Sequence, residues 1–330
     1  MKNLYVISGV TGMTGNELAR QLLREGHCVI GFDNFFASSI HSIEDIVNAC
    51  DFHFFEYDLN NESQMNQIEK SVHQYKIGCQ SIAYVNCAAV VHTEHFYEVE
   101  HTFQTNVISM RTFLQQAINV KATLFINCST SEVYSMQSWN EEGGVKESDF
   151  LLLATAEHSQ RTSYAVGKLL TEFFMKDAVD KGLIKGCSIR FANVYSNHER
   201  FAKHIIPHII NALLDQGGVT LLENSKKNQR SFLHNIDSCR AVLELMNAET
   251  ALDGTVYNVA TDEEISIVEL VTLLAGKLGI DHPTIHFDGY RTADPERRIL
   301  NTDKICHRTH WRPLVSLSEG LDMCVASIKK

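Results

Sequence analysis

The sequence predicts an α/β fold, in which a doubly wound parallel sheet is followed by a smaller mixed C-terminal part. The first observation behind this prediction is that short apolar runs alternate with longer runs whose apolar residues recur every three or four positions. Strands that alternate with helices pair in parallel and carry helices on both faces of the sheet. The second observation is that the alternation ends after Phe191, where helical runs separated by short strands dominate.

The individual elements follow from these patterns in chain order. We predict strands at the short apolar runs Leu4–Ser8, Cys28–Phe32, Phe52–Tyr57, Ile82–Cys87, Thr123–Cys128 and Cys187–Phe191. Between them, apolar spacing of three and four predicts the helices Glu17–Glu25, Glu62–Tyr75, Tyr97–Asn119 and Tyr164–Lys181. The later helical runs are Ile205–Leu214, Ile236–Met246 and Ile267–Leu278.

Composition excludes several classes of protein. The 330 residues are 44% hydrophobic and 21% charged, the balance of an ordinary globular protein, which excludes a disordered tail, a collagen and a coiled coil. The net charge is −11, and no run of Lys and Arg is longer than two. Because a phosphate-backbone binder needs a concentrated basic face, we expect no nucleic-acid partner.

Hydropathy and cysteine usage favour a cytoplasmic protein. The longest uncharged apolar stretch, Phe150–Ala156, is far shorter than the ~20 residues that span a bilayer. The apolar core at the N-terminus is about five residues long, whereas a secretory signal needs ~7–15. The nine cysteines are odd in number and include no C-x-x-C pair, so we expect buried free thiols.

A glycine motif follows the first predicted strand and opens a helix: Gly9-Val-Thr-Gly12-Met-Thr-Gly15. Glycines permit a tight turn and close approach of backbone N–H groups to a pyrophosphate, and the helix N-terminus adds partial positive charge. About twenty residues on, Asp33 ends the second strand, where a carboxylate accepts the hydroxyls of an adenosine ribose. It would repel a 2′-phosphate, and no arginine lies at positions 34–40. The motif therefore predicts NAD rather than NADP as the cofactor.

A second motif pairs a phenol with an ammonium group. In Tyr164-Ala-Val-Gly-Lys168 the two side chains share one face of a helix, because they are four residues apart. The ammonium favours the phenolate and brings the tyrosine pKa towards neutrality, which makes Tyr164 a usable base. Thr130 lies at the carboxyl end of the fifth strand, where parallel sheets bind ligands. We expect its hydroxyl to bond a substrate oxygen while Tyr164 takes the proton.

Further motifs follow in a consistent order along the whole chain. They are Asn86-Cys-Ala-Ala89 after the fourth strand, Asn106, Thr130, Tyr164 with Lys168, Arg190-Phe-Ala-Asn193-Val-Tyr195, Arg230-Ser-Phe-Leu-His234, Tyr257-Asn258 and the segment from Arg291 to Asp294. With the glycine motif, this order resembles that of the extended short-chain dehydrogenases/reductases, in the nucleotide-sugar epimerase/dehydratase family.

The resemblance implies a seven-stranded Rossmann sheet, a nucleotide-diphosphate sugar as substrate and a homodimer. The implied NAD-binding domain is 1–191, with a later segment near 230–260 returning to it, and 192–330 mainly binds the nucleotide sugar. The implied NAD-binding residues are Gly9, Thr11, Gly12, Met13, Gly15, Asp33, Asn34, Asp58, Leu59, Ala88, Ala89, Asn106, Tyr164 and Lys168. The implied substrate-binding residues are Thr130, Asn193, Arg230 and Arg291. For Asp58, which closes the third strand, a bare turn residue is an equally good interpretation.

The resemblance also implies oxidation of the sugar at C4, with Thr130, Glu132, Tyr164 and Lys168 as catalytic residues. Thr130-Ser131-Glu132 resembles the Thr-Ser-Glu of GDP-mannose-type dehydratases and of UDP-glucuronate decarboxylases. A 4,6-dehydratase, in which Glu132 would remove the C5 proton, is our first hypothesis. A 4-epimerase is second, a UDP-glucuronate-type decarboxylase third and a non-catalytic NAD-binding regulator last. The dehydratase role needs the strand to continue from Thr130 through Glu132, so that both side chains point to one side.

Departures from the family pattern lie on the substrate side. Ser135 replaces the usual glycine after Tyr134, and Ser196-Asn197 replace a Gly-Pro pair. The resemblance therefore implies the cofactor more directly than it implies the substrate. Two histidine pairs, His204 with His208 and His92 with His95, lack a third ligand at a suggestive spacing, so we expect no metal site.

Overall fold

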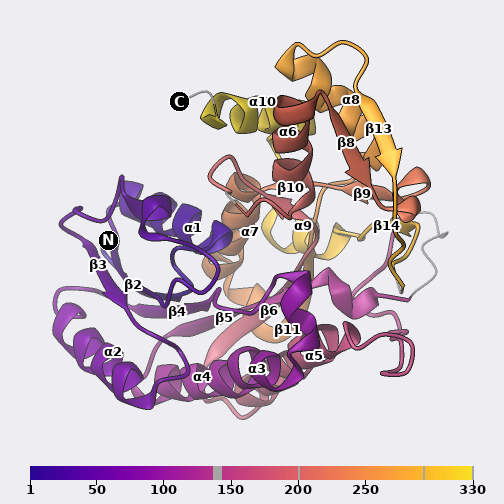
Figure 1. Cartoon of the computed structure of the whole chain (residues 1–330). Coiled ribbons are helices and arrows are strands. Elements are labelled where there is room, and N and C mark those ends of the chain that lie inside the picture. Colours follow the sequence, from indigo (N-terminus) through magenta and orange to yellow (C-terminus); the bar gives the residue numbers. More distant parts are fainter. Residues whose placement is uncertain (137–142, 200, 293, 329–330) are drawn as a thin grey trace.

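The computed structural model describes residues 1–136, 143–199, 201–292 and 294–328. A seven-stranded parallel sheet lies at its centre (Figure 1), in the order β11-β6-β5-β4-β1-β2-β3. The strands are β1 (Leu4–Ser8), β2 (Cys28–Asp33), β3 (Phe52–Glu56), β4 (Ile82–Asn86), β5 (Leu124–Thr130), β6 (Lys185–Phe191) and β11 (Asp253–Val259). The order runs outwards in both directions from the neighbours β1 and β4, so the predicted doubly wound Rossmann sheet is confirmed.

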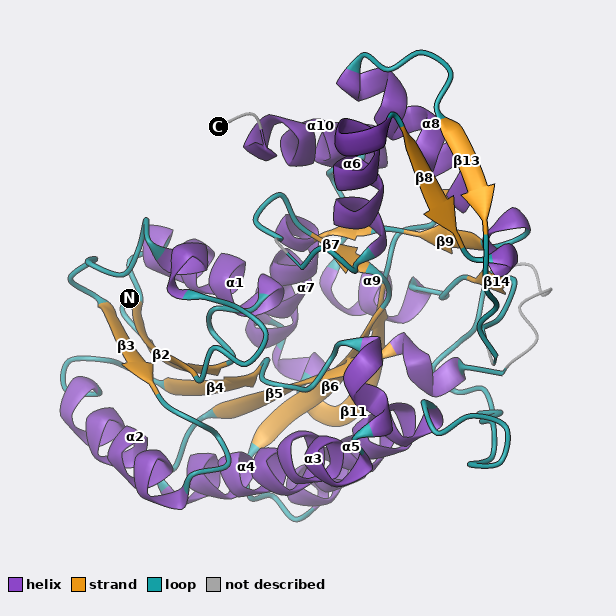
Figure 2. Ribbon diagram, viewed as in Figure 1, coloured by secondary structure: helices purple, strands orange, loops and turns teal. Residues whose placement is uncertain are grey.

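Helices cover both faces of this sheet (Figure 2). One face carries α1 (Met13–Arg24), α7 (Asn235–Asn247) and α9 (Asp303–Thr309). The other carries α2 (Glu62–Tyr75), α4 (Met110–Asn119) and α5 (Thr162–Asp180). Strand β1 shows why both layers are needed, since Tyr5 and Ile7 pack on the first face while Leu4 and Val6 pack on the second.

The remaining elements form a smaller part at the carboxyl edge of the sheet. Its helices α6 (Ile205–Gln216), α8 (Ile267–Leu278) and α10 (Leu317–Ile328) share a separate apolar core. Its short strands are β7 (Val194–Tyr195), β8 (Gly218–Leu221), β9 (Gln229–Ser231), β10 (Leu233–His234), β12 (Glu264–Ser266), β13 (Thr284–Phe287) and β14 (Arg297–Arg298). The chain passes from this part back to the sheet through α7 and β11, and β11 pairs with β6. The domain boundaries stay a prediction.

One predicted helix is interrupted. The segment expected as a single helix from Tyr97 to Asn119 comprises α3 (Val99–Phe103), a π-helical stretch η3 (Gln104–Ser109) and α4. The apolar spacing is helical throughout, and it does not reveal the wider turn around Asn106. Within the described residues, no helix combines the length and apolarity that crossing a bilayer requires.

Candidate active site

A cleft of about 1010 Å³ opens at the carboxyl edge of the sheet. Most of the residues predicted to bind the cofactor or react line it: Gly9, Thr11, Gly12, Met13, Gly15, Asp33, Asn34, Asp58, Leu59, Ala88, Ala89, Thr130, Tyr164, Lys168 and Asn193. Asn106, Glu132, Arg230 and Arg291 are not part of this lining. The cleft therefore brings together the glycine motif and the Tyr164/Lys168 motif, while the four other predicted residues lie outside its lining.

Two glycines of the glycine turn (Gly9–Gly15), Gly9 and Gly15, lie too close to neighbouring backbone to carry a side chain. A Cβ atom on Gly9 would lie 2.6 Å from the backbone nitrogen of Ala88, and one on Gly15 would lie 2.2 Å from the carbonyl oxygen of Gly9. Gly9 also has a φ of +68°, in the region that favours glycine. Helix α1 begins at Met13, so its free N–H groups face the cleft beside a bare backbone. This turn fits a dinucleotide pyrophosphate.

Asp33 ends β2 with its carboxylate on the cleft. The two oxygens accept the backbone N–H groups of Thr11, at 3.1 Å, and Phe35, at 2.9 Å. The carboxylate thereby ties the glycine turn to the next loop, at the position where a ribose would lie. Its negative charge fits NAD and opposes the 2′-phosphate of NADP.

Asn106 has a positioning role in the structure. It is fully buried, and its side-chain amide bonds both the N–H (2.7 Å) and the carbonyl (3.2 Å) of Val90. The π-helical stretch supplies this amide beneath the loop that lines the cleft. Asp58 lines the cleft and also accepts the backbone N–H of Asn60 at 2.7 Å, so the two interpretations of this residue are compatible.

Thr130 and Tyr164 meet at the end of β5. Thr130 is the last residue of that strand, and its hydroxyl bonds the Tyr164 phenol. The ring of Tyr164 stacks on Phe96, with centroids 4.2 Å apart and an interplanar angle of 6°. One turn further along α5, the Lys168 ammonium donates to the carbonyl of Cys128 at 2.8 Å.

The pKa of Tyr164 moves opposite to the sequence-based expectation. Burial raises it well above its usual value, the Glu132 carboxylate raises it further, and the bond with Thr130 only partly opposes them. Burial also lowers the pKa of Lys168. The side chains of the protein alone therefore hold Tyr164 as the neutral phenol, a proton donor, and the expected phenolate needs additional positive charge in the cleft.

Glu132 does not lie on a continued strand. Strand β5 ends at Thr130, and Ser131–Tyr134 form a 3₁₀ turn, η4, whose N-terminus the Thr130 hydroxyl caps. The expectation that Glu132 and Thr130 share one side of an extended strand is wrong, because the capped turn rotates the chain immediately after Thr130.

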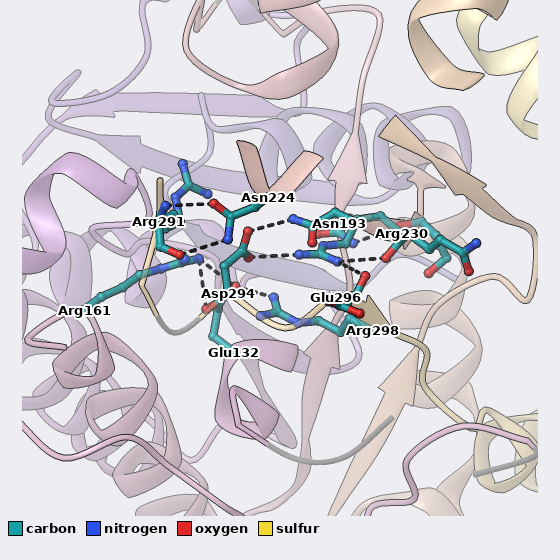
Figure 3. Close-up of polar contacts among 12 residues, drawn as sticks. Glu132, Arg161, Asn193, Asn224, Arg230, Arg291, Asp294, Glu296 and Arg298 are labelled. Atoms are coloured by element: carbon teal, nitrogen blue, oxygen red, sulfur yellow. Dashed lines mark hydrogen bonds and ion pairs between the residues drawn. The ribbon is translucent and has the colours of Figure 1, made fainter. Parts of the chain in front are cut away.

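The Glu132 carboxylate is instead held by two arginines (Figure 3). Arg161 donates to both carboxylate oxygens at 3.1 Å, and Arg298 forms a second ion pair. Burial by itself would raise the pKa of Glu132, but Arg298 and Arg161 outweigh it and lower this pKa to about 2. Glu132 is therefore held in place as an ionised carboxylate, and while both arginines bind it, it is a weak base.

Glu132 belongs to an arginine cluster, which we define as Arg161, Arg230, Arg291 and Arg298 with Glu132 and Asp294. Strands β9 and β14 place Arg230 and Arg298 side by side, and Arg230 is paired with Asp294 at 2.9 Å. Burial and Arg298 lower the pKa of Arg230 to about 10. Four guanidinium groups here face two carboxylates, so the cluster carries excess positive charge.

Several donors of the arginine cluster have no hydrogen-bond partner. These are Nε and Nη1 of Arg161 and Nε and Nη2 of Arg298, all of them buried. Arg161 immediately precedes α5, one turn before Tyr164, and Asn193, which lines the cleft, lies next to Arg230 (Figure 3). The cluster thus adjoins the reactive end of the cleft and offers donors to an anion. Sequence reasoning missed Arg161 and Arg298, although Arg161 lies three residues before Tyr164.

The histidine pairs bond to one another and to other partners. His92 Nδ1 lies 3.3 Å from His204 Nε2, and His204 Nδ1 lies 2.6 Å from Glu199. His208 instead bonds the carbonyl of Thr220 at 3.1 Å. No group of three or more metal-ligating side chains occurs within the part of the chain that the structure describes.

Known proteins resemble this chain over its whole length. A UDP-glucuronic acid decarboxylase 1 from Xenopus tropicalis is 24% identical, with 98% of this chain and 72% of the relative aligned. A dTDP-D-glucose 4,6-dehydratase from Homo sapiens is 23% identical over 96% of this chain and 87% of the relative.

Solved structures share the fold. A UDP-glucose 4-epimerase from Thermotoga maritima, solved with UDP-glucose, superposes with a TM-score of 0.85, 21% identity and coverage of 99% and 98%. A dTDP-glucose 4,6-dehydratase from Streptomyces venezuelae, solved with NAD, has a TM-score of 0.85, 22% identity and coverage of 99% and 97%. Residues 5–260 match the family described as the NAD dependent epimerase/dehydratase family. The chain therefore belongs to this family, and its cofactor is NAD.

Proposed function

We propose that the protein oxidises a nucleotide-diphosphate sugar at C4 and acts on the resulting 4-keto sugar. The observation that carries this proposal is the contact of the Thr130 hydroxyl with the Tyr164 phenol on the cleft, with Lys168 one turn away. A sugar hydroxyl placed between Thr130 and Tyr164 would find one group to orient it and one to take its proton. NAD, when bound, accepts the hydride and returns it later.

The fate of the 4-keto sugar depends on the arginine cluster. Removal of the C5 proton, as in dehydration, needs a base, and the ion pairs of Glu132 make it a poor one. A 4-keto sugar with a C6 carboxylate is a β-keto acid and needs no base. Its C5–C6 bond breaks, the electron pair forms the C4–C5 enolate, and CO₂ leaves. The unpartnered donors of Arg161 and Arg298 suit such a carboxylate. We therefore place decarboxylation of a nucleotide-sugar uronate first.

A 4,6-dehydratase is the second candidate, favoured by one observation. Glu132 is the carboxylate that follows Thr130 by two residues, and its side chain is 19% exposed. A substrate that drew Arg298 away from Glu132 would leave the Glu132 carboxylate free to act as a base. In that case Glu132→Gln would stop elimination after the first oxidation, and NADH absorbance would appear with substrate and persist.

The deciding experiment is incubation with UDP-, GDP-, CDP- and dTDP-sugars, neutral and C6-oxidised, followed by mass spectrometry. Loss of the mass of CO₂ supports the first candidate, and loss of the mass of water supports the second. An unchanged mass with altered NMR couplings indicates a 4-epimerase and overturns both. The Tyr164→Phe variant is the control and should give none of these products. Bound NAD without turnover of any sugar would indicate the non-catalytic regulator.

We also propose that the protein forms a homodimer through α3 and α5 and works in the cytoplasm. These adjacent helices expose five large apolar side chains: Val99, Phe103, Val166, Leu170 and Phe173. A contiguous apolar surface of this kind marks an interface. Sedimentation analysis should give the dimer mass for the wild type and the monomer mass for Phe173→Glu, and a wild-type monomer would contradict the proposal.

A further inference from the structure

Two cysteines that the proposed chemistry does not use are in contact at the floor of the cleft. All nine cysteines are free thiols, and the Sγ atoms of Cys87 and Cys128 lie 3.8 Å apart. Cys87 directly follows β4, and Cys128 lies in β5. Because Asn86 pairs with Asn127 in the parallel ladder, Cys87 and Cys128 are opposite neighbours. Both line the cleft, and an oxidant entering the cleft would meet them.

The positions of the two cysteines satisfy the requirements of a disulfide. Adjacent strands lie ~4.8 Å apart, and disulfides join Cα atoms separated by ~4.4–6.8 Å. The Sγ atoms have to approach from 3.8 Å to ~2.05 Å, a change of the size that side-chain rotation and small strand shifts supply. The two thiols also differ in reactivity. A hydrogen bond from Cys87 and the charge of Lys168 lower the pKa of Cys128, while the same contact and burial raise the pKa of Cys87. Cys128 is therefore the better nucleophile of the two.

The pair connects two parts of the active site. The Lys168 ammonium donates to the carbonyl of Cys128, so a movement of Cys128 moves the acceptor of the catalytic lysine. Cys87 directly precedes Ala88, whose backbone packs closely against Gly9. A Cβ atom on Gly9 would lie only 2.6 Å from the backbone nitrogen of Ala88. A bond that draws the two strand ends together would displace both contacts.

We propose that Cys87 and Cys128 are a reversible redox modification site, which a hydroperoxide converts to a disulfide that switches off the active site. The Cys128 thiolate attacks the peroxide, the O–O bond breaks, and Cys128 becomes a sulfenic acid with release of water. The Cys87 thiol then attacks this sulfur, forms the S–S bond and releases a second water. The two thiols lose two electrons and two protons in all, and H₂O₂ is reduced to two molecules of water. A thiol reductant reverses the bond by exchange.

The proposal has a consequence for the cofactor. If the disulfide distorts the glycine turn and the Lys168 contact, the oxidised protein binds NAD more weakly. By linkage, bound NAD must then oppose oxidation to the same degree. The proposal rests on the proposed function only for its activity readout, because disulfide formation and NAD binding need no sugar.

The test treats the full-length protein with H₂O₂, blocks free thiols by alkylation and maps the peptides by mass spectrometry. We expect one cross-linked pair, Cys87–Cys128, slower cross-linking in the presence of NAD and full recovery with dithiothreitol. Turnover of the identified nucleotide sugar should fall about 10²-fold on oxidation, as for a ~1 Å misplacement of a reacting group. The exposed Cys50 supplies a matched control, since Cys50→Ser should remain as sensitive as the wild type.

Two variants keep the proposal falsifiable. Cys87→Ala and Cys128→Ser should each resist reversible inactivation by H₂O₂ and retain NAD binding afterwards. The proposal is overturned if these variants lose NAD binding on oxidation as the wild type does, or if the cross-linked peptide contains the nearby Cys187 or Cys239. If either variant does not fold, the peptide map and the NAD titration of oxidised wild-type protein decide. Absence of turnover with every sugar would overturn the proposed function, but the peptide map and the NAD titration would still test the redox site.

Discussion

The glycine turn and the arginine cluster lie at the same edge of the sheet but are built in opposite ways. The turn is a short stretch of backbone in which neighbouring atoms leave no space for a Cβ on Gly9 or Gly15. The arginine cluster is made of charged side chains that come from η4, the residue before α5, β9, β14 and, for Arg291 and Asp294, the segment between β13 and β14. The turn binds through backbone geometry, whereas the cluster depends on a balance of buried charges.

This difference shows where the chain can change its chemistry. A side chain at Gly9 or Gly15 must displace backbone, so these two positions tolerate little variation. The cluster changes its charge and shape with each substituted side chain. Substrate specificity within one family is therefore expected to reside in the cluster and cofactor specificity in the turn, and the following predictions test that division.

The largest effect is expected where the two regions meet, at Tyr164. Tyr164→Phe removes the group that we propose exchanges a proton with the sugar, and turnover should fall ~10²–10⁴-fold. NAD affinity, measured by calorimetry, should stay unchanged because the phenyl ring keeps its stack on Phe96. Lys168→Ala should reduce both the turnover and the NAD affinity. Near-normal turnover of Tyr164→Phe on the identified substrate would show that another group takes the proton.

The arginine cluster should respond strongly to loss of one charge. Arg298→Met removes one partner of the buried Glu132, which should cost ~3–5 kcal/mol of unfolding free energy in urea. The neighbouring Arg297 pairs with Glu264 but is itself 37% exposed, whereas Arg298 is 4% exposed, so Arg297→Met should cost only ~0–1 kcal/mol. Equal losses of unfolding free energy in the two variants would mean that the cluster is no more sensitive to the loss of one arginine than an exposed ion pair is.

The stability of the cluster should also depend on pH in a defined direction. The pKa of Glu132 is lowered from 4.5 to about 2 in the folded chain, so its contribution is complete above pH 4.5 and is lost as pH falls towards 2. In Arg298→Met this folded-state pKa is less depressed, so the loss should begin at the same pH, which the unfolded chain sets, but should be smaller and should end at a higher pH than in the wild type. Thermal melts between pH 6 and pH 2 measure the difference, and identical profiles would contradict it.

The glycine turn should respond to the smallest possible side chain. Gly15→Ala places a methyl group 2.2 Å from a carbonyl oxygen, and such overpacking costs ~1–3 kcal/mol. Gly276→Ala is the matched control, because no atom lies within 4 Å of the added Cβ in the exposed face of α8, and it should stabilise by ~0.5–1 kcal/mol. Urea denaturation without cofactor compares the two, and opposite signs are the expected result.

The smallest effect concerns the choice of cofactor. Asp33 should make NAD bind more tightly than NADP by about tenfold or more, which corresponds to ~1.4 kcal/mol. Asp33→Asn keeps the acceptor for the Thr11 N–H and removes the charge, so the preference should shrink. Calorimetric titration with NAD and with NADP measures this preference, and equal affinities of the wild type for the two cofactors would contradict the role assigned to Asp33.

The two regions also differ in how well the sequence predicts them. Gly9, Gly12, Gly15 and Asp33 lie within one strand–helix–strand unit, and a local pattern is enough to place them at one edge. The alternation of strands and helices likewise predicts the sheet, because its central strands are buried on both faces. Such features depend on residues near one another in the sequence.

The arginine cluster depends instead on long-range pairing. Arg230 and Arg298 become neighbours only because β9 pairs with β14, and nothing local to either arginine indicates that register. The 3₁₀ turn η4 that follows Thr130 was not predicted, because the Thr130 hydroxyl that caps it competes with extension of the strand and gives no periodic signal. The family resemblance places Asn106 among the cofactor residues, and its bonds to Val90 could not be predicted because the π-helical stretch leaves no periodic signal.

The late return of β11 to the sheet has a consequence for synthesis of the chain. Strand β6 is complete once residue 191 has left the ribosome, but its partner β11 ends at Val259. Until then β6 is an open edge with unpaired backbone groups and a largely buried sequence, the kind of edge that recruits other strands. A nascent chain released at residue 191 is therefore expected to aggregate, and a fragment that extends through residue 260 should remain in the supernatant after centrifugation.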